Sequence, residues 1–159
     1  MAMSTPLGRN CAASPLWIRI SLTTVDEMNE YSWHAGMKTV EMSDITTEYK
    51  VLYFDRPNCG MCSQVTPKMA EIYNEFKEKL DIQFLAINLG GGYKEWIEYT
   101  QAIGADWENL RGPGGDSGEI YNKYYIDNIP QIYLLKEDTV VAKGINDIDL
   151  KEILKSIRP

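Results

Sequence analysis

Two short apolar runs separated by a helical pattern dominate the first half of the chain. Residues 51–54 and 82–87 are mostly apolar and are bounded by polar residues, which is typical of strands buried on both faces. Between them, apolar residues recur at helical spacing, namely Met69, Ile72, Tyr73, Phe76 and Leu80. Pro67 lies early in this helix, so we expect a kink or a break there. The pattern predicts a strand, a long helix and a second strand.

Glycine-rich stretches divide the elements that follow. After glycines 90–92, a second predicted helix is marked by Trp96, Ile97 and Ile103. Gly104 is suited to end this helix because glycine readily adopts the left-handed conformation of a C-cap. Residues 112–118 predict a loop, and a short helix is expected to follow and to end near Tyr124.

The two ends of the chain complete the predicted sheet. Residues 132–135 and 139–142 read as a hairpin across residues 136–138. A final helix is expected to carry one apolar side, made of Ile148, Ile153, Leu154 and Ile157. Upstream, residues 38–42 alternate between polar and apolar, which predicts a strand, and residues 16–22 could form another. This order of strands and helices predicts an α/β sandwich with a mixed sheet.

Composition and charge restrict the classes of function. With 159 residues, 44% hydrophobic and 25% charged, the chain suits one domain with a segregated core. The formal charge is −7 and no basic run occurs, which argues against a nucleic-acid partner. The longest apolar runs, such as residues 84–87, are far too short to cross a bilayer. Residues 1–3 read like a cloning start, so we expect that an export signal has been removed.

The candidate chemistry is the pair Cys59-Gly60-Met61-Cys62, placed after a buried strand and at the start of a helix. Two cysteines that share the first helical turn can bring their sulfurs within disulfide reach. The first sulfur faces free backbone N–H groups and the positive end of the helix dipole, which stabilise a thiolate. The second sulfur lies one turn further in and can resolve a mixed disulfide. We therefore predict Cys59 as the nucleophile and Cys62 as the resolving cysteine.

Other uses of a Cys-x-x-Cys pair fit the sequence less well. A c-type haem motif requires histidine after the second cysteine, and Ser63 stands there. A zinc site would require two further ligands, for which the chain offers only Cys11 and His34. An inert structural disulfide is a further alternative. We expect no metal and no cofactor besides a redox-active Cys59–Cys62 disulfide, with Cys11 as a free thiol.

A proline directly before a predicted strand is the second candidate feature. Ile129-Pro130 precedes residues 131–135, and proline cannot donate a hydrogen bond to a sheet. On the residues alone, a cis Ile–Pro bond and a trans proline that opens an edge strand explain this position equally well. A cis bond would turn the polar groups of Ile129 outward, where an extended substrate segment could pair with them. The predicted substrate-contact residues are Asn58, Gly60, Met61, Ile129 and Pro130.

Together these motifs resemble the thioredoxin fold. The strand at 51–54, the Cys-Gly-Met-Cys pair, Pro67 and Ile129-Pro130 before a hairpin and a terminal helix carry the resemblance. Residues 38–45 and the inserted helix around 94–104 are similar to the TlpA/ResA branch of extracytoplasmic thioredoxin-like proteins of Bacteroides-type bacteria. The resemblance covers residues 35–159 and leaves 1–34 as an N-terminal extension. It implies a three-layer α/β/α sandwich with a mixed central sheet, an N-terminal strand extension and an inserted helix.

The resemblance also implies an activity. Proteins of this branch are thiol–disulfide oxidoreductases of the periplasm or cell envelope that maintain cell redox homeostasis. Their partners are protein disulfides and an upstream thiol electron donor, and some are anchored to a membrane in their native precursor. By resemblance, Cys59 is the attacking thiol, Cys62 the resolving thiol and Pro130 a cis-proline, and the domain is expected to be monomeric.

Several positions differ from the family pattern. Acidic residues that many relatives place six residues before the first cysteine, or three after the second, are Tyr53 and Val65 here. Asp55 and Glu71 are the acidic residues nearby in the sequence. The usual proton acceptors beside the second cysteine are therefore missing from their usual positions.

These departures support a second hypothesis. Asn58 precedes the first cysteine, and Met61 replaces the proline that many thioredoxins have between the cysteines. The alternative function is a non-catalytic binding module that holds a partner in the groove at Pro130 and keeps Cys59–Cys62 as a structural disulfide.

Overall fold

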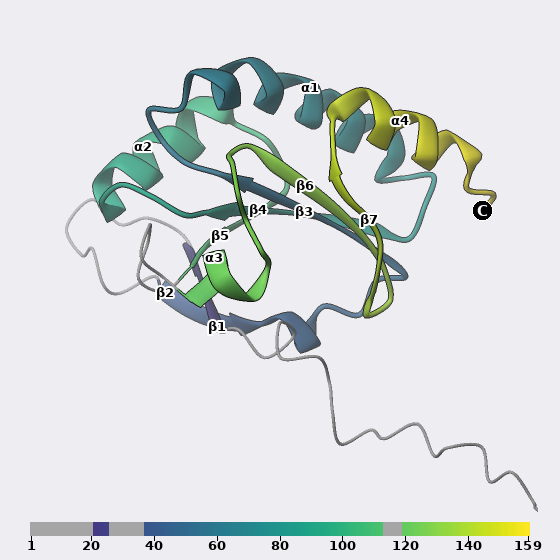
Figure 1. Cartoon of the computed structure of the whole chain (residues 1–159), viewed down its shortest axis with the longest axis horizontal. Coiled ribbons are helices and arrows are strands. Elements are labelled where there is room, and N and C mark those ends of the chain that lie inside the picture. Colours follow the sequence, from purple (N-terminus) through teal and green to yellow (C-terminus); the bar gives the residue numbers. More distant parts are fainter. Residues whose placement is uncertain (1–20, 26–36, 113–118) are drawn as a thin grey trace, which may run out of the picture.

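A computed structural model describes residues 21–25, 37–112 and 119–159 and shows a twisted mixed sheet with helices on both faces (Figure 1). Within these residues the sheet has seven strands in the order β2-β1-β5-β4-β3-β6-β7. They are β1 (Ser21–Val25), β2 (Met37–Glu41), β3 (Tyr49–Asp55), β4 (Ile82–Asn88), β5 (Glu108–Arg111), β6 (Gln131–Lys136) and β7 (Thr139–Ile145). Strands β3, β4 and β5 are parallel, and the neighbouring pairs outside them are antiparallel.

The helices form the two outer layers. They are α1 (Gly60–Phe76), α2 (Tyr93–Ile103), α3 (Glu119–Lys123) and α4 (Asp147–Ser156), with a 3₁₀ turn η2 at Met42–Asp44. In Figure 1, α1, α2 and α4 lie on one face of the sheet and α3 lies on the other. The three-layer α/β/α sandwich with a mixed sheet, an inserted helix and an N-terminal strand is therefore confirmed.

Alternation along the central strands divides the core between the two faces. In β3, Val51 and Tyr53 pack among the apolar residues of α1 and α4, whereas Leu52 and Phe54 pack on the side of α3. The same alternation runs through β4 and β6, as expected for strands covered on both faces. Asp55 continues the Val51–Tyr53 series, so its side chain belongs to the face that α1 and α2 cover.

Most of the predicted elements are present, and two strands differ from expectation. The predicted strand 38–42 is β2, although Met42 already belongs to η2. The predicted strand 16–22 corresponds to β1 at Ser21–Val25, and residues 16–20 lie outside the described part. Strand β5 was not predicted, because it has four residues of which only Leu110 is fully buried. Gly104, with φ 59°, ends α2 as predicted.

The helices differ in detail from expectation. Of the kink or break expected at Pro67, the break does not occur, since α1 is one helix from Gly60 to Phe76, and Leu80 lies beyond its end. In α4, Ile148 is 67% exposed and does not join the apolar side, whereas Leu150 and Leu154 are fully buried. Leu150 and Leu154 are four residues apart, so they lie on the same side of the helix and both face the core. Ile148 lies in the first turn and faces solvent.

We predict that the buried stripe of α4 stabilises the fold and that Ile148 does not. Leu154→Ala should lower the free energy of unfolding by about 2–5 kcal/mol, because it removes a fully buried side chain and leaves a cavity. Ile148→Ala, the matched control on the same helix, should change it by less than about 0.5 kcal/mol. Urea denaturation measures both values, and equal effects would contradict the assigned burial.

Candidate active site

The two cysteines of the pair lie at the start of α1 and are joined by a disulfide. Cys59 is the N-cap residue of α1, and the backbone N–H of Cys62 donates to its Sγ at 3.1 Å. The Sγ atoms are 2.29 Å apart and the Cα atoms 5.1 Å apart. Cys62 is fully buried, whereas Cys59 is partly exposed. A reactant from solvent can therefore reach the sulfur of Cys59 but not that of Cys62.

Local backbone geometry places the Cys59 sulfur at the helix terminus. Residues 56–59 connect β3 to α1, and Asn58 turns the chain with φ 58°, a left-handed conformation that asparagine tolerates better than most residues. Cys59 is extended, with φ −107° and ψ 112°, so its side chain can fold back over the first turn. That turn carries no acidic residue, and its free N–H groups make an environment that stabilises a thiolate.

The loop before β6 forms the other side of the site. The Ile129–Pro130 peptide bond is cis, the isomer implied by the resemblance. The carbonyl oxygen of Ile129 lies 4.0 Å from Cys59 Sγ, so the structure brings this loop and the first cysteine together. The remaining predicted contact residues surround Cys59 and are exposed, namely Asn58, Gly60 and Met61, the last with 60% of its surface in solvent.

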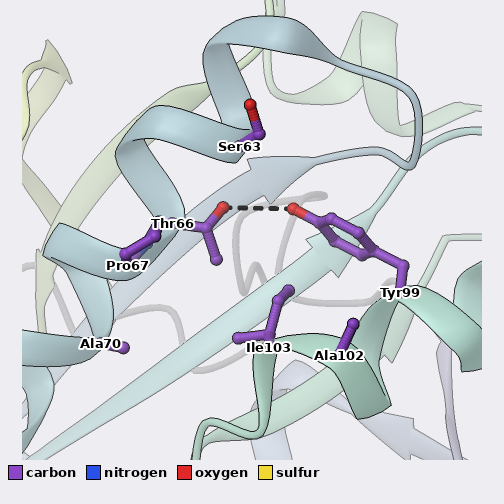
Figure 2. A pocket seen from close by; sticks show the side chains of 7 residues that line it. All are labelled: Ser63, Thr66, Pro67, Ala70, Tyr99, Ala102 and Ile103. Carbon is purple, nitrogen blue, oxygen red and sulfur yellow. Dashed lines mark hydrogen bonds between the residues drawn. The ribbon is translucent and has the colours of Figure 1, made fainter.

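A buried hydrogen-bonded network lies behind the cysteine pair and was not predicted from the sequence. Tyr99 of α2 donates its hydroxyl to Asp55 Oδ2 at 3.0 Å. The Tyr99 hydroxyl is also 3.1 Å from Thr66 Oγ1 of α1, the contact drawn in Figure 2, and Thr66 is 2.8 Å from the Tyr53 hydroxyl. The network therefore connects β3, α1 and α2, and Thr66 lies one helical turn after Cys62.

Burial is the main cause of the pKa shifts in this network. It raises the pKa of Asp55 to about 7, and the hydrogen bond from Tyr99 offsets only part of that effect. Burial likewise raises the pKa values of Tyr53 and Tyr99 above their ordinary range. Glu71, the other acidic residue that the sequence offered, is exposed on α1. The alternation of β3 could have indicated a buried carboxyl at Asp55, but no sequence signal pairs it with Tyr99.

Arg111 holds the glycine turn after β4 in place, next to the loop that leads to Cys59. The Arg111 guanidinium donates to Asn88 Oδ1 at 2.8 Å and to the carbonyl oxygens of Gly90 and Gly91. Gly91 has φ 72°, and a Cβ there would come within 3.4 Å of the Pro57 ring. The glycine turn thus packs against the segment that leads to Cys59, and its left-handed backbone explains why glycine suits this position.

The described residues offer neither a cluster of metal ligands nor a membrane-spanning helix. Among residues 21–25, 37–112 and 119–159, no group of three or more His, Cys, Asp or Glu side chains could hold a metal ion. Cys11 and His34, the further ligands considered for zinc, lie outside the described residues. In the described part of the chain, no helix is both long and apolar enough to cross a membrane.

Comparison with known sequences identifies a family and a curated relative. The family is described as thioredoxin-like, and its match covers residues 47–141, which includes both cysteines and Pro130. The relative is the thiol-disulfide oxidoreductase ResA of Oceanobacillus iheyensis, 26% identical over 137 residues. The aligned region covers 84% of this chain and 69% of ResA.

Solved structures share the fold. A thiol:disulfide interchange protein from Bacteroides sp. has a TM-score of 0.71 at 21% identity, covering 88% of this chain and 87% of its own. The thioredoxin domain of a thiol-disulfide oxidoreductase from Bacteroides vulgatus has a TM-score of 0.70 at 22% identity, covering 87% and 93%. A secreted disulfide oxidoreductase from Mycobacterium tuberculosis has a TM-score of 0.67 at 14% identity, covering 89% and 98%.

The buried Asp55 carboxyl predicts a specific dependence of stability on pH. Between about pH 4 and pH 7, the unfolded chain has Asp55 ionised while the folded protein keeps it protonated. The folded state then binds more protons, so its stability falls as the pH rises through this window. Above about pH 7 the penalty is complete and reaches up to about 4 kcal/mol.

The isosteric variant Asp55→Asn isolates this effect, because all other groups titrate alike in both proteins. Relative to the variant, the wild-type protein should lose stability from about pH 4 to about pH 7 and then stay level. Urea denaturation of both oxidised proteins across this range measures the difference. A difference that does not vary with pH would show that Asp55 titrates as an ordinary carboxyl.

Proposed function

The chain belongs to the thioredoxin-like family and is a thiol–disulfide oxidoreductase, and we propose that it reduces or exchanges disulfides of cell-envelope proteins through Cys59 and Cys62. The observation that carries this proposal is the unequal exposure of the two sulfurs at the start of α1, where one is reachable and the other is fully buried. Because the family match covers both cysteines, the pair lies within the shared domain.

The reaction follows from this geometry in two exchanges. With the pair reduced, the Cys59 thiolate attacks one sulfur of a substrate disulfide, forms a mixed disulfide and releases the other substrate sulfur as a thiolate. The Cys62 thiolate then attacks the Cys59 sulfur, 3 residues away in the chain, and releases the second substrate thiolate. The protein ends oxidised, and an upstream dithiol donor returns two electrons to it. No metal or further cofactor takes part.

Substrate contact is proposed for the residues around the reachable sulfur. Asn58, Gly60 and Met61 are exposed beside Cys59, and the Ile129 carbonyl lies 4.0 Å from its Sγ. An extended segment that carries the substrate cysteine can pair with the backbone at Ile129-Pro130 as an added strand. This arrangement holds the substrate through main-chain groups and so accepts different side chains.

The cellular setting is part of the proposal. The similarity to ResA and to a neighbour described as secreted supports a periplasmic or envelope location. We assign residues 35–159 to the thioredoxin-like domain and residues 1–34 to an extension that adds β1 to its sheet. The domain acts as a monomer, with anchoring of the native precursor to a membrane as the expected arrangement in the envelope.

The proposal predicts different trapping by the two cysteine variants. Cys62→Ser should accumulate mixed disulfides with substrate proteins, because Cys59 attacks but cannot be released. Cys59→Ser should trap none, because the remaining sulfur is buried. Non-reducing electrophoresis of cell-envelope extracts measures both, with the double variant as the background control. Equal trapping by the single variants would contradict the assigned roles, and no trapping by either would favour the non-catalytic binding module.

A further inference from the structure

An apolar pocket of about 270 Å³ lies between α1 and α2. Its walls are the side chains of Pro67 and Ala70 on α1 and of Ala102 and Ile103 on α2. Thr66 and Tyr99, which also line it, are hydrogen-bonded to each other (Figure 2). This volume lies just below the range of about 300–1,000 Å³ that holds whole drug-sized ligands. It suits a single large side chain.

The polar part of this pocket can accept hydrogen bonds but has no donor left to offer. An ionised Asp55 only accepts, so the Tyr99 hydroxyl donates to it. The Tyr99 oxygen then accepts from Thr66, and Thr66 in turn accepts from Tyr53. Each hydroxyl proton is used within the network, and only oxygen lone pairs remain. An occupant must therefore bring its own donor, and a carboxylate would be repelled by the charge of Asp55.

The pocket lies close to the active site along α1. Ser63, which lines the pocket, directly follows Cys62, and its backbone N–H bonds to the carbonyl of Cys59. The lining residues of α1 from Ser63 to Pro67 lie about 6–12 Å from Cys59 along the helix axis, at about 1.5 Å per residue. An extended peptide advances about 3.3 Å per residue. A side chain two to four positions from an attacked cysteine therefore reaches the pocket.

The geometry points to this pocket as a specificity subsite that takes a tyrosine side chain, two to four residues from the cysteine of the disulfide substrate. The phenol ring fills the apolar walls, and its hydroxyl donates to the Tyr99 oxygen. Two properties of the pocket favour this occupant over a carboxylate side chain, namely the Tyr99 oxygen, whose proton is already donated to Asp55, and the charge of Asp55 buried behind it. The inference rests on the proposed oxidoreductase function and adds a preference among its substrates.

The test uses short peptides joined as symmetrical disulfides, with the residue three positions from cysteine, on either side, set to Tyr, Phe, Gly or Glu. With dithiothreitol as reductant, at a pH above 7 where Asp55 is ionised, kcat/KM is measured for each. Tyr should exceed Phe by about threefold to tenfold, the effect of one hydrogen bond. Tyr should exceed Gly by at least about tenfold, the effect of burying an aromatic ring, and Glu should be slowest.

Two leucine variants on α2 distinguish an effect of the pocket from an effect on the rest of the enzyme. Ala102→Leu fills the pocket and should remove the preference for Tyr, while Gln101→Leu, at the neighbouring exposed position outside the pocket, should retain it. Both should reduce glutathione disulfide at the wild-type rate, which also reports correct folding. Equal rates for the Tyr and Gly peptides, or a preference that survives Ala102→Leu, would overturn the subsite. If the wild-type protein reduces neither the peptides nor glutathione disulfide, the oxidoreductase function itself fails, and the subsite with it.

Discussion

The packing of α1 across β3 is the constraint on which the site depends. Val51 and Tyr53 of β3 and Met69 and Ile72 of α1 are all buried in one core, so neither element can shift without exposing apolar surface. Since residues 56–59 alone connect them, the first turn of α1 must lie at the carboxyl end of β3. That geometry places one sulfur at the helix terminus and the other inside the protein, and this unequal exposure is the basis of the roles proposed for them.

The sequence allowed the fold and the cysteine pair to be predicted because both depend on local patterns. Apolar runs and helical periodicity marked the central strands and helices, and the Cys-x-x-Cys spacing marked the reactive turn. Strand β5 was missed because its short, half-polar sequence carries no periodic signal. Ile148 was wrongly assigned to the apolar side of α4, because periodicity cannot show where a helix leaves the sheet. The Asp55–Tyr99 bond could not be predicted, since it joins residues 44 positions apart through tertiary packing.

The buried network includes a carboxyl, Asp55, on the same strand as one of the two family positions that lack an acidic residue here. Tyr53 occupies that position and joins a chain of hydrogen-bonded hydroxyls that ends at Asp55, two residues further along β3. The network ties the inserted helix α2 to the strand and helix that carry the active site. Two of its side chains, Thr66 and Tyr99, also line the α1–α2 pocket. One set of contacts therefore holds the inserted helix in place and forms part of the pocket wall.

The central claim is that Cys59 and Cys62 form a pair that cycles between oxidised and reduced states. A redox titration of the protein in dithiothreitol and glutathione buffers, read by thiol alkylation and mass, tests it most directly. We predict a reduction potential between about −270 and −200 mV, the range from thioredoxin to the glutaredoxins. A pair that remains oxidised down to below about −300 mV, as structural disulfides do, would contradict the account and identify the bridge as a structural element.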